Sequence, residues 1–172
     1  MESNKTEQAI AQENIISILK EKYEDQILLV ETPYEFLTVT LKKEKIKEII
    51  HYLYHHDGTK FQFLTTLFGV HYPDQNEIAI VYQLHNMRSN QRLRLKIYLS
   101  ADKPTAPSIT DIFAGANWME RETYDFFGVI FEGHPKLKRI LNVDDMIIFP
   151  MRKEYPLEDQ TREDKNNTMF GR

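Results

Sequence analysis

Hydrophobic and polar residues alternate along the chain with two different periods, and each period predicts one kind of element. Residues 91–99 show the clearest period of two, which is typical of a strand with one buried face. The side chains predicted to face inward are Leu93, Leu95, Ile97 and Leu99, and those predicted to face outward are Arg92, Arg94, Lys96 and Tyr98. A charged outer row is the normal solvent face of such a strand.

Four further strands are predicted at residues 27–31, 35–41, 61–70 and 77–84. Thr32-Pro33 separates the first two, which are expected to form a hairpin or two neighbouring edge strands. Polar turns at 73–76 and 86–90 link the last three, and links this short make neighbouring strands antiparallel.

A period near 3.6 predicts three helices. The first spans about 7–22, with Asn4 as its cap, and the second spans 43–56 before Asp57-Gly58. The third is predicted to start at Ser108, with Asp111 reaching back to the free amides, and to end at Gly128.

The order of elements, α-β-β-α-β-β-β-α, predicts an α+β fold: a two-layer sandwich with helices packed on one face of a mainly antiparallel sheet. Residues 1–141 are predicted to form this globular domain. Residues 142–172 carry neither period and are predicted to form an extended C-terminal arm that docks on partner subunits. We expect this arm to make few contacts with its own domain, with Arg152, Tyr155 and Leu157 as anchors.

The composition of the chain argues against several classes of protein function. The 172 residues carry a net charge of −4, which argues against nucleic-acid binding because that affinity depends on a basic surface. No run of about 18 apolar residues occurs, so no membrane span is expected. The first residues have neither a signal core nor a transit pattern, which is typical of a bacterial cytosolic chain. The absence of cysteine removes disulfides, thiolate nucleophiles and cysteine-ligated iron–sulfur clusters.

An unusual cluster of acids lies near the end of the third predicted helix. Glu120, Glu122 and Asp125 stand where the helix dipole disfavours negative charge. Arg121 is within reach of Asp125 and of the Trp118 ring, and we expect Arg121 to pair with an acid in the assembled protein. The nearest surplus cations are Lys136, Lys138 and Arg139, so we also expect an acid of the cluster to meet this segment or a cation of a partner.

The residues of this region occur in a recognisable order. The first block runs Ala116-Asn117-Trp118, Glu120-Arg121-Glu122, Asp125, Phe127-Gly128, Gly133-His134-Pro135, Leu137 and Arg139-Ile140-Leu141. The second block is Pro150-Met151-Arg152-Lys153-Glu154-Tyr155-Pro156-Leu157. Both blocks resemble the signatures of the C subunit, the 30-kilodalton subunit family of respiratory complex I, the proton-translocating NADH:quinone oxidoreductase. Met151, Glu154, Lys136 and Lys138 depart mildly from the family pattern.

The resemblance implies a structural and assembly subunit that holds no cofactor, while FMN and Fe–S clusters belong to partner subunits. It implies a hetero-oligomer with the D subunit of complex I as chief partner and the B and I subunits nearby, peripheral on the cytoplasmic side of the bacterial inner membrane. The residues then expected at the subunit interface are Trp118, Glu120, Arg121, Glu122, Asp125, Gly128, Gly133, His134, Pro135, Arg139, Arg152, Lys153 and Tyr155. No catalytic, cofactor-binding or metal-binding residue is expected.

Three alternatives stay open at this point. Glu122, Asp125 and His134 are a possible acid–base set of a free-standing enzyme, although no substrate-binding motif accompanies them. The chain is also compatible with the equivalent subunit of a ferredoxin-dependent or hydrogenase-type relative. His51 and His55 have metal-ligand spacing on one helix, but a third ligand is missing, so a metal site is disfavoured.

Overall fold

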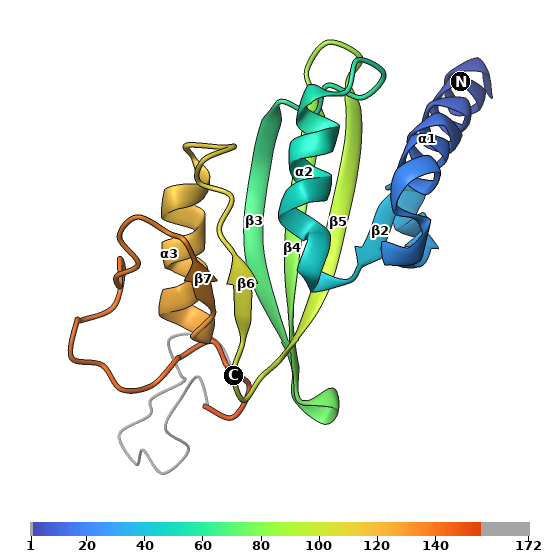
Figure 1. Ribbon diagram of the computed structural model, residues 1–172. Coiled ribbons are helices and arrows are strands. Elements are labelled where there is room, and N and C mark those ends of the chain that lie inside the picture. Colours follow the sequence, from blue (N-terminus) through green and yellow to red (C-terminus); the bar gives the residue numbers. More distant parts are fainter. Residues whose placement is uncertain (1, 156–172) are drawn as a thin grey trace, which may run out of the picture.

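The computed structural model describes residues 2–155, and side chains from residue 9 onward. Figure 1 shows helices laid against a twisted sheet. The α-helices of the described residues are α1 (Glu2–Tyr23), α2 (Ile46–His55) and α3 (Ala116–Phe127). The main strands are β1 (Ile27–Glu31), β2 (Thr38–Leu41), β3 (Phe63–Tyr72), β4 (Glu77–Asn86) and β5 (Gln91–Ser100). The predicted α+β class is confirmed.

The five strands form one sheet in the order β1-β2-β5-β4-β3. The predicted hairpin of β1 with β2 and the antiparallel pairing of β3, β4 and β5 are confirmed. The join between the two groups was not predicted: β2 pairs parallel with β5, with Val39 opposite Leu95. The chain reaches this arrangement because α2, β3 and β4 intervene between the two strands, which leaves enough length for the crossover that a parallel pair needs.

One face of the sheet carries the core. Register places Leu95 of β5, Tyr82 of β4 and Leu67 of β3 in one row, and all three side chains are buried. Helix α2 covers this face with Ile46, Ile49, Ile50 and Leu53. Helix α1 adds Ile15 and Leu19, and its Tyr23 ring meets the Tyr52 ring of α2 at 5.5 Å.

Helix α3 packs on the same face over β3. A Cβ at Gly69 of β3 would lie 2.8 Å from the Phe127 ring, so the close approach of helix and strand requires glycine there. A second small sheet flanks α3: β6 (Thr105–Pro107) pairs parallel with β7 (Ile130–Glu132). Sequence patterns missed these strands because three residues are too short to show a period.

The predicted start of the third helix is wrong by seven residues, because the N-cap expected at Ser108 is Gly115. The helix begins at Ala116, and the preceding residues form turns in which the Phe113 and Ala116 amides donate to the Ile109 and Phe113 carbonyls. Asp111 does not cap a helix but forms an ion pair of 3.0 Å with Lys47 of α2. The predicted end at Gly128 is confirmed.

No helix among the described residues is long and apolar enough to cross a membrane. His51 and His55 stack at 4.3 Å between ring centroids, and Nδ1 of His55 bonds the His51 carbonyl.

Candidate functional site

Asp125, near the C-terminal end of α3, organises the chain that follows the helix. Its carboxylate is fully buried and accepts five hydrogen bonds. Oδ2 accepts the amides of Ile140, Leu141 and Asn142 at 2.8–3.0 Å, and Oδ1 accepts Arg139 Nη1 at 2.7 Å and Asn142 Nδ2 at 3.0 Å. Burial alone would raise the pKa of Asp125, but the three amides and Arg139 outweigh it and hold this pKa far below its usual range. The carboxylate therefore stays ionised.

Arg139 joins the helix end to two later stretches of chain. Besides the carboxylate, its guanidinium donates to the carbonyl of Asp125 at 2.9 Å and to the carbonyls of Met146 and Ile148. The guanidinium also lies over the Phe149 ring, 5.2 Å from its centroid, and the side chain is only 6% exposed. The expected meeting of an acid of the cluster with the segment 136–139 is thus confirmed, in the pair Asp125–Arg139.

Gly128 has two reasons to be glycine. Its backbone is left-handed, with φ of 77°, and its amide closes the helix on the Tyr124 carbonyl at 2.8 Å. A Cβ here would also lie 2.5 Å from the Phe149 ring, so the ring rests directly on the glycine. The end of the helix and the segment that returns to it are packed as one unit.

Residues 142–155 lie against their own domain, so the expectation of few contacts is wrong for this part of the arm. The Met151 amide donates to the Phe126 carbonyl at 3.2 Å, and the Lys153 amide donates to His71 Nδ1 at 2.9 Å. Arg152 Nε donates to the Phe127 carbonyl at 2.8 Å, which occupies part of the fork predicted for a partner carboxylate. Tyr155 bonds back to Arg152 through its amide. Leu157 and the rest of the arm lie outside the described residues, and docking on a partner stays a prediction.

Glu120 is the second buried carboxylate of α3, and no cation of the described residues contacts it. Oε1 accepts the Ile109 amide at 2.8 Å, and Oε2 accepts Ser108 Oγ at 2.7 Å. Burial is the main cause that raises the pKa of Glu120 to about 7, against the partial offset of these two donors. Ser108, predicted to be a helix cap, is instead a hydrogen-bond donor to this carboxyl.

The hydroxyl of Tyr82, on β4, belongs to the same interior. It is buried without a hydrogen-bond partner. Burial and, second, the negative charge of Glu120 raise the pKa of Tyr82. Both effects keep the Tyr82 hydroxyl protonated.

Arg121 does not pair with Asp125, because Arg139 occupies that carboxylate. Its guanidinium donates instead to the carbonyls of Lys138 and Arg139, at 3.1 and 3.0 Å. An acid partner in an assembled protein stays a prediction. Arg121 therefore bonds the carbonyls of residues 138 and 139, while Asp125 bonds the amides of residues 140–142.

The turn at 133–135 is fixed by His134. The Lys136 amide donates to Nδ1 at 3.0 Å, so Nε2 carries the proton and donates to the Asn117 carbonyl at 3.1 Å. Gly133 has a φ of 85°, which the turn requires. No hydrogen bond joins His134, Asp125 and Glu122 in the described residues, and Glu122 is exposed. The structure does not bring the possible acid–base set together.

Exposed apolar side chains surround this framework. On α3 and β7 these are Trp118 and Ile130, and on the returning segment they are Leu141, Val143, Ile147 and Met151. We call these six residues the signature surface. Leu141 is 65% exposed and Ile147 is 93% exposed, although both are close in sequence to residues that Asp125 and Arg139 hold in place. Exposed apolar side chains mark an interaction site where they gather in one patch.

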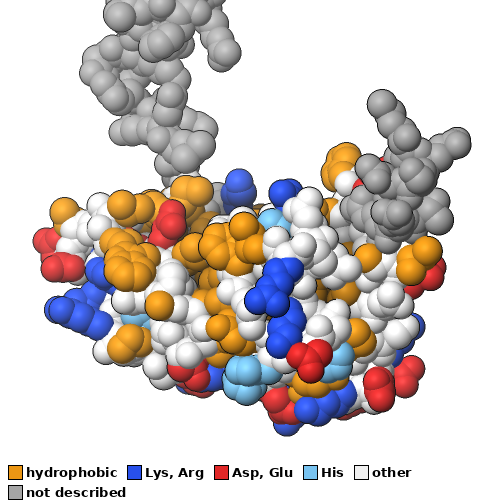
Figure 2. Space-filling view, turned by 90° about the horizontal axis from the view of Figure 1, so that it is seen from above, with side chains coloured by type: hydrophobic (Ala, Val, Ile, Leu, Met, Phe, Trp, Pro, Cys, Tyr) orange, Lys and Arg blue, Asp and Glu red, His pale blue; other side chains and the backbone are white. Residues whose placement is uncertain are grey.

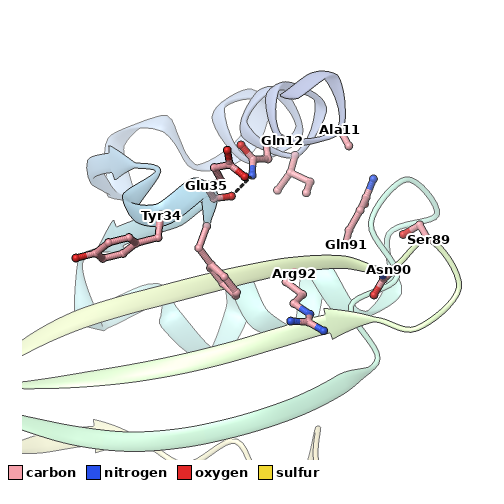
Figure 3. A pocket seen from close by; sticks show the side chains of 10 residues that line it. Ala11, Gln12, Tyr34, Glu35, Ser89, Asn90, Gln91 and Arg92 are labelled. Carbon is pink, nitrogen blue, oxygen red and sulfur yellow. Dashed lines mark hydrogen bonds between the residues drawn. The ribbon is translucent and has the colours of Figure 1, made fainter. Parts of the chain in front are cut away.

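A cleft of about 680 Å³ lies elsewhere, between α1, the turn at 34–36 and the turn at 89–92 (Figure 3). Gln12 Nε2 bonds the Glu35 carbonyl at 2.9 Å across it, and Arg92 and Asn90 line the opposite wall. None of the residues expected at a subunit interface lines this cleft. The interface residues predicted from sequence therefore belong to α3 and the segment after it.

Comparison with known proteins points to one family. Residues 39–161 match the family model described as the respiratory-chain NADH dehydrogenase 30 kDa subunit. The chain is 40% identical over 135 residues to the C subunit of NADH-quinone oxidoreductase from Nocardioides sp., with 77% of this chain and 54% of the relative covered. It is 38% identical to the same subunit of Citrifermentans bemidjiense, with 84% and 89% covered. The chain thus spans about half the length of several of these relatives and most of the length of another.

Two solved structures share the fold. One is a chain of a membrane-bound sulfane sulfur reductase, an archaeal respiratory complex, with a TM-score of 0.72, 27% identity, and 84% of this chain and 85% of that chain covered. The other is a trypsin-resistant fragment of Nqo5, with a TM-score of 0.60, 30% identity, and 72% and 98% covered.

Proposed function

The chain belongs to the family of the 30 kDa subunit of respiratory-chain NADH dehydrogenase, and from this membership we propose that it is a cofactor-free structural subunit of an NADH:quinone oxidoreductase. Its role is to hold a docking surface in place for neighbouring subunits. The observation that carries the proposal is the Asp125–Arg139 junction, which fixes the backbone on both sides of the exposed side chains of Leu141 and Ile147.

The physical reason is pre-organisation. A docking loop that is already ordered loses less conformational entropy when it binds, so more of the contact energy remains as affinity. Asp125, Arg139 and Arg121 make eight of the hydrogen bonds that order residues 138–148, none of which needs a partner. The aliphatic side chains are therefore free to contribute their apolar area to an interface.

In this proposal the partners follow the resemblance: the D subunit of complex I chiefly, with the B and I subunits nearby, on the cytoplasmic side of the bacterial inner membrane. FMN and Fe–S centres lie in other subunits and carry electrons from NADH to quinone, coupled to proton translocation. This chain supplies shape and charge to the complex. The lack of cysteine supports the assignment of the clusters to partners.

The geometry disfavours the acid–base enzyme. A general base needs a free lone pair near a substrate, but the Asp125 carboxylate is fully buried and saturated by donors. Both ring nitrogens of His134 are engaged by backbone groups. Glu122 alone is exposed, without either companion.

The test is a native purification from membranes with an affinity tag on this chain. We expect flavin- and iron–sulfur-containing proteins to co-purify, with NADH:quinone reductase activity in the same fraction. A fraction that reduces sulfur compounds or evolves hydrogen instead would assign the chain to a different respiratory complex. A tagged chain that purifies alone, as a compact monomer, would contradict the proposal.

A further inference from the structure

The outer face of the sheet, opposite the helices, has the composition of a covered surface. Residues Ile78 to Tyr82 of β4 are all apolar and all buried. A continuous apolar run is typical of a strand covered on both faces, whereas a strand with a solvent face alternates. Helices α1, α2 and α3 contribute side chains to the one core cluster on the inner face, and Figure 1 shows α2 lying along β4 and β5 on one side of the sheet.

Register shows what lies on the outer face. Val81 of β4 is flanked by Phe68 of β3 and Lys96 of β5, and Ala79 is flanked by Val70 and Tyr98. Phe68 is 40% exposed, and Phe63 is also exposed. The β5 row of Arg92, Arg94 and Lys96 has the charged character expected of a solvent face, but the rows of β4 and β3 at Ala79, Val81, Phe68 and Val70 do not.

The cations of this face are held on aromatic rings. Lys96 Nζ lies 4.7 Å from the Tyr98 centroid and 5.1 Å from the Tyr72 centroid, and it donates to Tyr72 Oη at 3.2 Å. The Arg94 guanidinium lies 4.7 Å from the Phe36 ring. Rings in these positions hold the cations in place and reduce their hydration.

No acid within the described residues neutralises the row. No ion pair of the described residues includes Arg92, Arg94 or Lys96. Glu77 stands at the far end of β4, and Glu31 stands on the edge strand β1, beyond Thr38. The centre of the face therefore combines Arg94 and Lys96, which form no ion pair within the described residues, with exposed aromatic side chains, while Arg92 lies at the cleft that Glu35 also lines.

We propose that the outer face of β3, β4 and β5 is a second docking surface, and that its occupant is an acidic protein surface with apolar side chains between its carboxylates. Charge complementarity indicates a negatively charged partner surface, because these cations attract carboxylates and repel a basic partner. The aromatic and arginine content matches the composition enriched at interface centres. The proposal rests on the proposed function, since the occupant is a neighbouring subunit of the same complex. Figure 2 views the molecule from above, toward the ends of the strands, where hydrophobic side chains also lie beside those of Lys, Arg and His.

Single-cysteine labelling tests the surface directly, because the wild-type chain has no cysteine. Thr66 lies opposite Gln83 on the outer face, so Thr66→Cys places the reporter there. Glu44→Cys, on an exposed turn outside the face, is the matched control. A maleimide reagent is applied to each variant as the isolated chain and within the purified complex.

We expect the labelling rate of Thr66→Cys to fall about tenfold or more on assembly and that of Glu44→Cys to change less than about twofold, because an interface centre excludes solvent. Equal rates in the isolated and assembled states would overturn the proposal. Slow labelling already in the isolated chain would also overturn it, and dependence on chain concentration would then identify a second copy as the occupant.

Charge reversal tests the chemistry of the occupant. Lys96→Glu is expected to lower incorporation into the complex at least about fivefold, with Lys96→Met less affected and Lys20→Glu on α1 unchanged. Incorporation of Lys96→Glu at the wild-type level would contradict an acidic partner. If the wild-type chain itself does not co-purify with a complex, the proposed function fails and this surface falls with it. If it co-purifies and Thr66→Cys stays reactive, only the second surface is overturned.

Discussion

Two carboxyl groups of helix α3 are hidden from solvent, and their pKa values are shifted in opposite directions. Asp125 and Glu120 are both fully buried and stand five positions apart, yet the pKa of Asp125 is held far below its usual range and that of Glu120 is raised to about 7. Burial raises both pKa values, more strongly for Glu120, and the donors add to the difference. Asp125 accepts five hydrogen bonds, one from a guanidinium, and Glu120 accepts two from neutral groups.

The number and charge of the donors, together with the depth of burial, decide whether a carboxyl group hidden from solvent is ionised. The two carboxyl groups also have separate tasks. The ionised Asp125 orders the segment after the helix, whereas Glu120, whose pKa is raised to about 7, bonds Ser108 and the Ile109 amide to the helix.

Replacing Asp125 with alanine should destabilise the protein most. It leaves Arg139 buried and unpaired and removes the acceptor of three amides, which together cost about 3–5 kcal/mol of unfolding free energy. Urea denaturation monitored by tryptophan fluorescence measures the loss. Asp111→Ala is the control, because this carboxylate is exposed and its ion pair with Lys47 contributes about 1 kcal/mol or less. A loss below about 1 kcal/mol for Asp125→Ala would show that the five hydrogen bonds are not holding the segment.

Glu120 and Asp125 should affect the pH dependence of the unfolding free energy in opposite directions. Since its folded pKa is about 7 and its unfolded value is 4.5, this group contributes stability that is complete below pH 4.5 and is lost as pH rises to about 7. The loss amounts to about 3 kcal/mol for this group. Asp125 acts in the reverse direction, because its depressed pKa gives stability that is present above the unfolded value of 3.8 and is lost as pH falls below it.

The variant Glu120→Gln measures how much the ionisation of Glu120 contributes to the pH dependence of stability. The variant should match the wild type within about 1 kcal/mol at pH 5 and exceed it at pH 8, because an amide carries no charge to bury. The other groups that influence Glu120 are Lys47, Asp111 and Tyr82, and all are retained. Parallel pH profiles for variant and wild type would show that Glu120 is not the titrating group.

Gly128→Ala should lower stability by about 1–3 kcal/mol, because it forces a left-handed backbone on alanine and drives its Cβ into the Phe149 ring. Gly115→Ala is the matched control, since it has a φ of −63° and no neighbour within 4 Å of the added carbon. Thermal unfolding compares the two. Similar melting temperatures for both variants would mean that Phe149 does not rest on Gly128.

Ser108→Ala should have the smallest effect, about 1 kcal/mol at pH 5, through loss of one hydrogen bond to Glu120. The cost should grow at pH 8, because the ionised carboxylate then loses one of two donors. Combining Ser108→Ala with Glu120→Gln sharpens this prediction, since the pH-dependent part should vanish in the double variant. If Ser108→Ala costs the same at both pH values, in the wild type and in Glu120→Gln alike, then Ser108 does not stabilise the ionised Glu120 carboxylate.

Local patterns in the sequence predicted those parts of the molecule that local forces determine. The alternation of residues 91–99 and the stop at Gly128 are of this kind. The pattern at Ser108 and Asp111 misled, because a serine that suits a helix cap equally suits a distant carboxyl, and Glu120 is twelve residues away. The pairing of β2 with β5 left no local trace at all.

The candidate site shows the same division. The sequence identified the acids, the cations and Gly128 near the end of the third helix, and the family resemblance assigned them to one expected interface. It did not identify which cation meets Asp125, because Arg121 and Arg139 are both plausible until the fold brings residue 139 beside the helix end. Nor did it reveal that residues 142–155 return to the domain, since this segment contributes mostly backbone amides and carbonyls to these hydrogen bonds, and backbone groups leave no side-chain pattern.

The central claim is that the signature surface attaches this chain to an NADH:quinone oxidoreductase. The most direct measurement is the amount of chain incorporated into the membrane complex, by native electrophoresis, for the double variant Leu141→Asp and Ile147→Asp. Leu28→Asp is the control, because Leu28 is 58% exposed on β1, away from this surface. We predict unchanged unfolding free energy for all variants, normal incorporation of Leu28→Asp, and a loss of about tenfold or more for the double variant, together with its NADH:quinone activity. Normal incorporation of a stably folded double variant would contradict the account.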